Sequence, residues 1–155
     1  MIRRLIILLL IVGCEEENQE YSILGKWIVT ESTNAVMSEN FDGCNYFSID
    51  TYFDITDDNF IWISEQIGMD ENGNPTTNWF SGWYFNYLDN SPNLTISIDY
   101  SFYSTNFQRE NNFTYEVNET ELKLQHISMI QDGDTTTCNS YLTATSISEV
   151  PEISN

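Results

Sequence analysis

The stretch Leu94-Thr95-Ile96-Ser97-Ile98-Asp99-Tyr100-Ser101-Phe102 alternates apolar and polar side chains without interruption. Because successive side chains of a β-strand point to opposite faces, this segment would have one apolar face and one face of Thr, Ser and Asp. A half-buried antiparallel strand, with one face on a core and the other in water, has this pattern. The stretch therefore predicts a β-sheet protein.

The chain on both sides of this stretch has the same character. Short polar turns separate β-like segments, and no stretch longer than a turn has helical spacing. The pair Asp132-Gly133 suits the left-handed turn of a hairpin. In the segment 46–55 the apolar face is predicted to hold Phe47, Ile49, Phe53 and Ile55. The predicted strands are 23–32, 46–55, 60–67, 78–88, 94–102, 112–117, 121–129 and 136–145.

Eight strands in sequence order favour a closed barrel. All connections are short except the first, at 33–45. An up-and-down barrel removes the exposed edges that an open sheet would leave. We therefore predict an all-β fold, an eight-stranded antiparallel barrel over residues 23–145. The interior of such a barrel holds packed side chains or one small ligand.

Three short motifs resemble a known family. Leu24-Gly25-Lys26-Trp27 resembles the Gly-x-Trp signature of lipocalins. The segments 82–85 (Gly-Trp-Tyr-Phe) and 119–124 resemble strands of the lipocalin-like lipoproteins of Bacteroidetes. The resemblance implies that Gly25 and Trp27 lie at the barrel base. In lipocalins this tryptophan packs under an arginine of the last strand, but 136–145 contains no arginine. The implied fold is therefore a looser lipocalin-like barrel.

The N-terminus has the features of an export signal. Two arginines (Arg3, Arg4) precede an apolar run over 5–12, which is shorter than the roughly 20 residues that span a bilayer. Ile11-Val12-Gly13-Cys14 resembles the bacterial lipobox, which implies a signal peptide at 1–13 and lipidation of Cys14. The implied location is the bacterial cell envelope, with an acyl anchor in the outer membrane. An ordinary cleaved signal with an incidental cysteine is the alternative.

Composition limits the possible partners. The chain has 24 acidic and five basic residues, and residues 14–22 form a polar, acidic segment that we interpret as a tether. Such a surface repels phosphate backbones, so nucleic-acid binding is not expected. Binding to the membrane would then depend on the acyl anchor. Residues 146–155 lack a periodic pattern and are predicted to form a flexible tail.

Cysteine usage agrees with export. Besides Cys14 the chain contains Cys44 and Cys138. Two cysteines in an oxidising compartment predict one disulfide. Two free buried thiols are the alternative.

Candidate ligand-binding residues are aromatic. On faces that should point inward, their rings would form an apolar cup with hydroxyl groups for a small molecule. Plain core packing is the alternative, and a hydrogen-bonded core histidine is the alternative for the single histidine. The candidates are Trp62, Trp83, Phe85, Tyr100, Tyr115 and His126.

The sequence predicts no catalytic residues, metal or cofactor. The acid pairs Asp57-Asp58 and Asp70-Glu71 suit turns better than glycoside hydrolysis, which needs carboxylates that converge across a cleft. Asp70-x-Asn72-x-Asn74 resembles the start of a calcium loop but lacks its glycine and its late glutamate. The leading hypothesis is a lipid-anchored carrier of a small apolar ligand. The alternative is an envelope module with a filled barrel whose loops contact a protein or glycan.

Overall fold

The computed structural model describes residues 21–33, 44, 47–102 and 105–154, and for 100–102 and 105–107 it describes the backbone only. Cys14, the predicted signal peptide and most of the predicted tether lie outside these residues. The described residues contain eight strands and no helix, so no helix among them is long and apolar enough to cross a bilayer. The strands are β1 (Gly25–Ser32), β2 (Tyr52–Ile55), β3 (Phe60–Met69), β4 (Pro75–Asn90), β5 (Asn93–Phe102), β6 (Thr105–Val117), β7 (Glu121–Gln131) and β8 (Asp134–Ser146).

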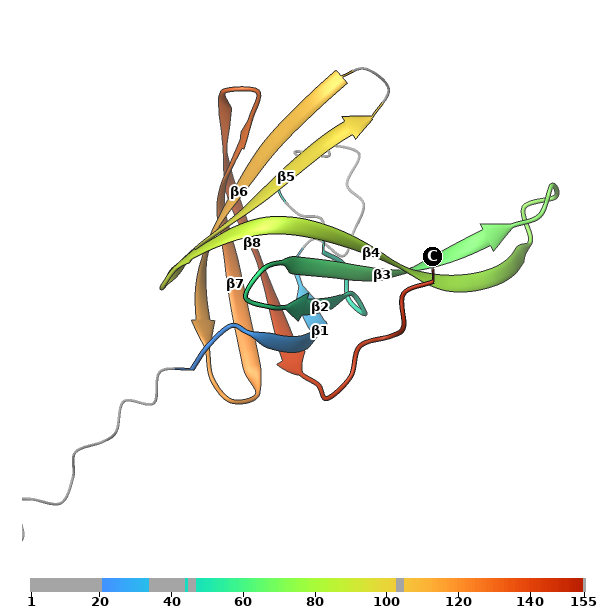
Figure 1. Cartoon of the computed structure of the whole chain (residues 1–155), viewed down its shortest axis with the longest axis horizontal. Helices are drawn as coiled ribbons and strands as arrows, with labels where there is room; N and C mark the ends of the chain where they lie inside the picture. Colours follow the sequence, from blue (N-terminus) through green and yellow to red (C-terminus); the bar gives the residue numbers. More distant parts are fainter. Residues whose placement is uncertain (1–20, 34–43, 45–46, 103–104, 155) are drawn as a thin grey trace, which may run out of the picture.

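The strands form one closed barrel in the order β1 to β8. Every neighbouring pair is antiparallel, and β1 closes the barrel against β8 with Ile28 opposite Thr145 and Val29 opposite Ala144. Figure 1 shows the strands wrapped around a common interior. The predicted fold class, an eight-stranded antiparallel up-and-down barrel, is confirmed.

The segment 46–55 differs from the prediction. Strand β2 begins only at Tyr52, because the chain makes a turn in which Asp50 has φ +66° and the Thr51 amide donates to the Ser48 carbonyl (3.2 Å). The turn breaks the alternation. Phe53 and Ile55 are buried as predicted, but Ile49 is 44% exposed.

A continuous apolar core fills the barrel at the end where β1 begins. Its aromatic members include Phe53 and Phe60, both fully buried, whose ring centroids lie 4.9 Å apart. Trp27 is also buried, and its indole N–H donates to the Ile23 carbonyl (2.9 Å). The chain before β1 therefore folds under the barrel, and Gly25 and Trp27 lie at this closed end.

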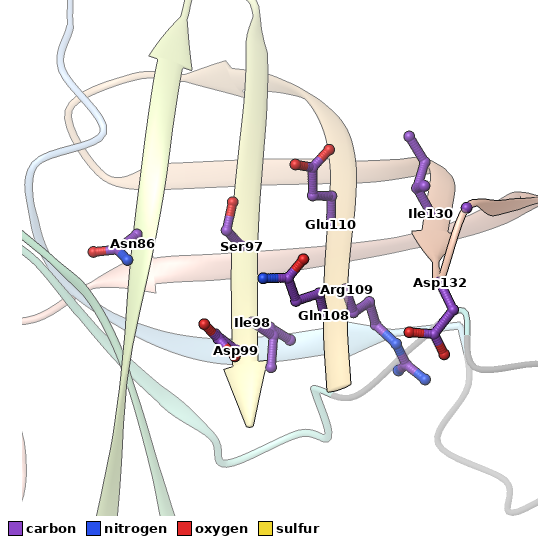
Figure 2. A pocket seen from close by; sticks show the side chains of 10 residues that line it. Asn86, Ser97, Ile98, Asp99, Gln108, Arg109, Glu110, Ile130 and Asp132 are labelled. Atoms are coloured by element: carbon purple, nitrogen blue, oxygen red, sulfur yellow. The ribbon is translucent and has the colours of Figure 1, made fainter. Parts of the chain in front are cut away.

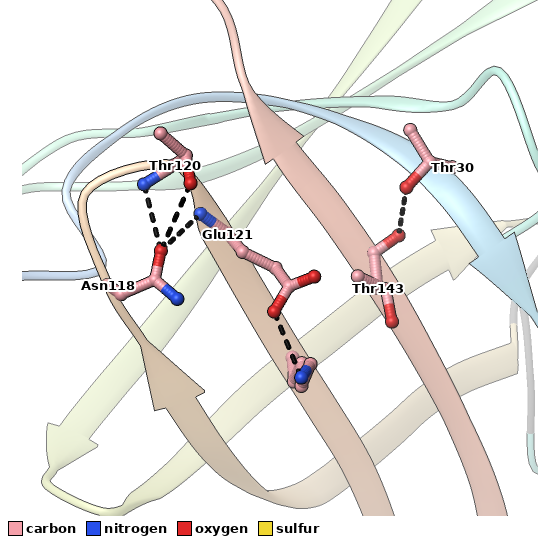
Figure 3. Close-up of polar contacts among 6 residues, drawn as sticks. Thr30, Asn118, Thr120, Glu121 and Thr143 are labelled. Atoms are coloured by element: carbon pink, nitrogen blue, oxygen red, sulfur yellow. Dashed lines mark hydrogen bonds and ion pairs between the residues drawn. The ribbon is translucent and has the colours of Figure 1, made fainter.

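Short turns join the strands at the closed end. In the turn between β6 and β7, the Asn118 side-chain oxygen accepts hydrogen bonds from the amides of Thr120 and Glu121, both at 2.9 Å (Figure 3). This Asx-type turn satisfies backbone groups that have no strand partner. In β7, Lys123 forms an ion pair with Glu121 (2.9 Å).

The opposite end of the barrel is flared. Strands β3 and β4 extend together beyond the barrel as an arm, while β5 and β6 diverge from them (Figure 1). The pairing between β4 and β5 stops at Asn86 and Ser97. A lateral gap between β4 and β5 therefore opens above these residues.

The chain after β8 returns to the barrel wall. The Ile147 amide donates to the backbone carbonyl of Lys26, and the Ser154 amide donates to the backbone carbonyl of Phe80 in β4. Both distances are 2.9 Å. Ile153 lies over Gly82, where an added Cβ would come within 2.4 Å of its Cδ1. The segment predicted as a flexible tail has no strand beyond Ser146, but it is held against β4.

Candidate functional site

The two tryptophans predicted to bind a ligand lie together in the barrel. Trp62 of β3 pairs in register with Trp83 of β4, and their rings stack with centroids 4.6 Å apart. Phe85, also on β4, is buried, and its ring lies 6.5 Å from that of Trp62. These three candidates form one aromatic surface, and both tryptophans are half-buried.

The other candidates lie elsewhere. Tyr115 is buried near the closed end, where its hydroxyl donates to Asp89 (2.9 Å). Burial is the main cause that raises the pKa of the Tyr115 phenol, so it stays protonated as a donor. Tyr100 belongs to β5, but its side chain lies outside the described residues. Tyr115 therefore belongs to the core, and its hydroxyl already has a partner.

His126 supports the long first loop. Its ring stacks on Phe113, with centroids 4.5 Å apart, and its Nδ1 is hydrogen-bonded to the Cys44 carbonyl oxygen. Since a carbonyl only accepts, Nδ1 carries the proton. The Ser140 hydroxyl donates to the same carbonyl (2.7 Å). The geometry agrees with the hydrogen-bonded core histidine that the sequence left open.

A disulfide fixes the same loop. Cys44 is bonded to Cys138 of β8, so the predicted disulfide is confirmed. Both cysteines are buried against Met129. The bond and the two hydrogen bonds of the Cys44 carbonyl thus hold Cys44 against β7 and β8.

Phe47 extends from this loop into the interior. Its ring packs edge-on against Phe53 and Trp62, with centroids at 4.9 and 5.7 Å. The side chain is buried within the main core. Phe47 therefore acts as a plug between the closed end and the tryptophan surface. The alternation places it inward, but the sequence does not show that it comes from a loop.

Buried side-chain atoms of Asn111 and Trp62 have no hydrogen-bond partner among the residues that the structure describes. Asn111 is 3% exposed, and its side-chain oxygen accepts no hydrogen bond. The indole nitrogen of Trp62 donates none. A buried polar group without a partner costs about 1–3 kcal/mol, so both positions suit a water molecule or a ligand. Asn111 was missed because β6 was predicted to begin at Asn112.

A hollow lies where β4 and β5 separate. It has a volume of about 620 Å³, and Figure 2 shows side chains of Asn86, Ser97 and Glu110 that line it from three neighbouring strands. Arg109 lies beside them and donates to the Gln131 side chain (2.6 Å). Burial lowers the pKa of the Arg109 guanidinium, and the nearby charge of Asp132 opposes this effect.

The predicted turn residues have the geometry of turns. One Asp70 carboxylate oxygen accepts from the amides of Asn72 (2.8 Å) and Asn74 (2.9 Å). Hydrogen bonds from Asn74 and Asn72 lower the pKa of Asp70 below 3.8. Among the described residues, no three His, Cys, Asp or Glu side chains gather as a metal site.

Comparison of the chain with protein-family models, with curated proteins and with solved structures gives no match.

Proposed function

We propose that this protein is an exported, lipid-anchored binding module without catalytic activity, and that it binds its partner with the flared half of the barrel. The proposal is supported by a difference between the two ends of the barrel. The closed half is filled by its core and by the plug Phe47, whereas the strands separate above Asn86 and Ser97. A filled barrel leaves the loops and the open strands as the surface for recognition.

Photo-crosslinking in native membranes tests this assignment. A photoreactive residue at Met69 on the arm, or at Asp132 in the β7–β8 turn, lies at the flared end, whereas one at Glu119 lies at the closed end. All three positions are exposed. We expect adducts from the two flared positions and none from Glu119. Adducts from Glu119 alone would contradict the proposal.

The membrane anchor is a separate part of the proposal. It is supported by the resemblance of residues 11–14 to a lipobox, with Cys14 as the acylated residue of an outer-membrane lipoprotein. Mass spectrometry of the denatured protein from its own membranes should show the acyl groups on Cys14. Cys14→Ala should release the protein from the membrane. An unacylated Cys14 would remove the anchor from the proposal.

A second candidate function is the binding of a small apolar ligand. It is favoured by the Trp62–Trp83 surface and by the side-chain atoms of Asn111 and Trp62, which have no hydrogen-bond partner among the described residues. Asn111 would accept a hydrogen bond from the ligand and Trp62 would donate one, so a flat molecule with a hydroxyl or amide group fits this chemistry.

Native mass spectrometry tests the second candidate. A co-purified small molecule should be lost in Asn111→Leu and kept in Asn139→Leu, since Asn139 is exposed on β8. Without a ligand, Asn111→Leu should instead be neutral or stabilise the protein by about 1–3 kcal/mol, because it removes a buried acceptor without a partner.

A further inference from the structure

Strand β5 has an edge that β4 leaves open. Pairing between these strands runs from Asn90 opposite Asn93 to Asn86 opposite Ser97 and stops there. Strand β5 nevertheless continues to Phe102 and stays paired with β6 on its other side. In Figure 1 the two strands run in clearly different directions beyond this point. Among the described residues, no strand pairs with the β4-facing edge of 98–102.

A segment from elsewhere in the chain already contacts β4. The segment after β8 lies along β4, where Ser154 donates to the Phe80 carbonyl and Ile153 packs over Gly82. A backbone carbonyl of β4 therefore accepts a hydrogen bond from a further segment of chain. An exposed row of backbone N–H and C=O groups is a template for such a segment, because each added residue can complete hydrogen bonds of the sheet.

Negative charge borders the open edge. The hollow at the separation of β4 and β5 is lined by three carboxylates, from Asp99, Glu110 and Asp132, and by one guanidinium, from Arg109 (Figure 2). Asp99 belongs to the open part of β5, and Glu110 of β6 pairs in register with Ser97 of β5. Both side chains are exposed. The hollow is therefore acidic beside backbone groups that can form hydrogen bonds.

We propose that an extended, basic peptide segment of a partner protein adds to the β5 edge as a further strand. This inference rests on the proposed function, because it names the chemistry of the partner that the flared half would bind. Backbone hydrogen bonds along 98–102 would supply affinity. Lysine or arginine side chains at alternate positions of the added strand lie on one face and would reach Asp99 and Glu110, which supplies specificity.

A basic peptide fits better than a second copy of this chain. The formal net charge of the chain is −19, so two copies repel each other over most of their surfaces. A cationic strand would neutralise the carboxylates of Asp99 and Glu110. Its binding should weaken at high salt, because the charges are exposed and screened within about 8–10 Å near physiological ionic strength.

NMR titration of the chain in detergent micelles tests the inference. The probe is a ten-residue peptide in which lysine and threonine alternate, and the control is the same peptide N-methylated at every residue. The control keeps its charge but cannot donate backbone hydrogen bonds. We expect the probe to shift the backbone amides of 98–102 and to bind at least about tenfold more tightly than the control.

Two matched protein variants separate local recognition from general attraction. Asp99→Asn with Glu110→Gln removes two charges beside the edge, and Glu116→Gln with Glu119→Gln removes two exposed charges toward the closed end. We expect about tenfold weaker binding for the first pair and little change for the second. Equal weakening in both, or equal binding of both peptides, would overturn the inference.

Other occupants of the edge have distinct outcomes. A concentration-dependent dimer with slowed hydrogen exchange at 98–102 would assign the edge to a second copy and overturn the inference. Slow exchange of these amides in the free monomer would show that the chain itself covers the β5 edge, and this would also overturn the inference. If crosslinking finds a partner at the flared end but the peptide does not bind, the proposed function stands and this inference fails. If both experiments are negative, both fail.

Discussion

The closed and flared halves of this barrel use the same eight strands in opposite ways. In the closed half, buried apolar side chains fill the core and the turns satisfy their own backbone groups, as Asn118 does. Just below the flared half, the buried side-chain oxygen of Asn111 has no partner among the described residues, and above Ser97 β4 separates from β5. We infer that the filled core at one end of the barrel stabilises the fold. Toward the other end, hydrogen-bonding groups without a described partner are available for binding.

Removal of a core ring in the closed half should have the largest effect. Phe53 is fully buried among Phe47 and Phe60, so Phe53→Ala should lower the free energy of unfolding by about 3–5 kcal/mol. Urea unfolding followed by tryptophan fluorescence measures this change. Leu88→Ala is the control, because Leu88 is 59% exposed, and it should change stability by no more than about 0.5 kcal/mol. Similar losses for both variants would show that the core is not centred there.

Loss of the disulfide should be the next largest effect. The bond joins residues 94 positions apart, and in the chain-entropy model it restricts the unfolded chain, with typical stabilisation of about 2–4 kcal/mol. Cys44→Ser with Cys138→Ser should therefore lower the free energy of unfolding by that amount. Reductant should produce the same loss in the native protein and no further loss in the double variant. An unchanged unfolding midpoint would contradict this expectation.

A smaller effect is expected where the last segment lies on β4. In Gly82→Ala the new methyl group would lie 2.4 Å from Ile153 Cδ1, so this flexible side chain must move, at a cost of about 1 kcal/mol. Hydrogen exchange of the Ser154 amide should become faster. Ile153→Ala relieves the contact, so the two substitutions together should cost less than their sum. Additive losses would show that Gly82 does not contact this side chain.

The smallest effect concerns pH at the tip of the arm. Hydrogen bonds from Asn74 and Asn72 stabilise ionised Asp70 and lower its pKa. The stabilisation is present above pH 3.8, the ordinary value, and is lost as pH falls through the lower folded pKa. An NMR titration of the Asp70 side chain should have its midpoint below 3.8, and Asn74→Ala should raise it. A native midpoint above 3.8 would contradict this assignment.

The sequence predicted the fold better than the site, for a physical reason. Alternation with period two is a local property, so β5 could be read directly from 94–102 and the barrel from eight such segments. The site depends on contacts between distant residues. Trp62 and Trp83 were correctly placed on inward faces, but no local pattern shows that they stack on each other while His126 binds the Cys44 carbonyl.

Strand boundaries were predicted less well because tertiary contacts set them. The turn at Asp50 ends the alternation before β2. Strand β6 begins at Thr105, seven residues before the predicted start, because β5 continues to pair with it. Extension of the alternating pattern backwards from Phe113 would have placed Asn111 inside the barrel.

The all-β class, the meander order and the disulfide could be predicted from the sequence, because strand alternation, turn residues and cysteine count are local properties of the chain. Only the tertiary structure decided which part of the barrel is filled and which is open. Phe47, from the connection between β1 and β2, packs into the core against Trp62, and no described strand pairs with the β4-facing edge of β5 beyond Ser97, because β4 follows β3 outward. Such features depend on how far each pair of strands stays in register, which no single segment specifies.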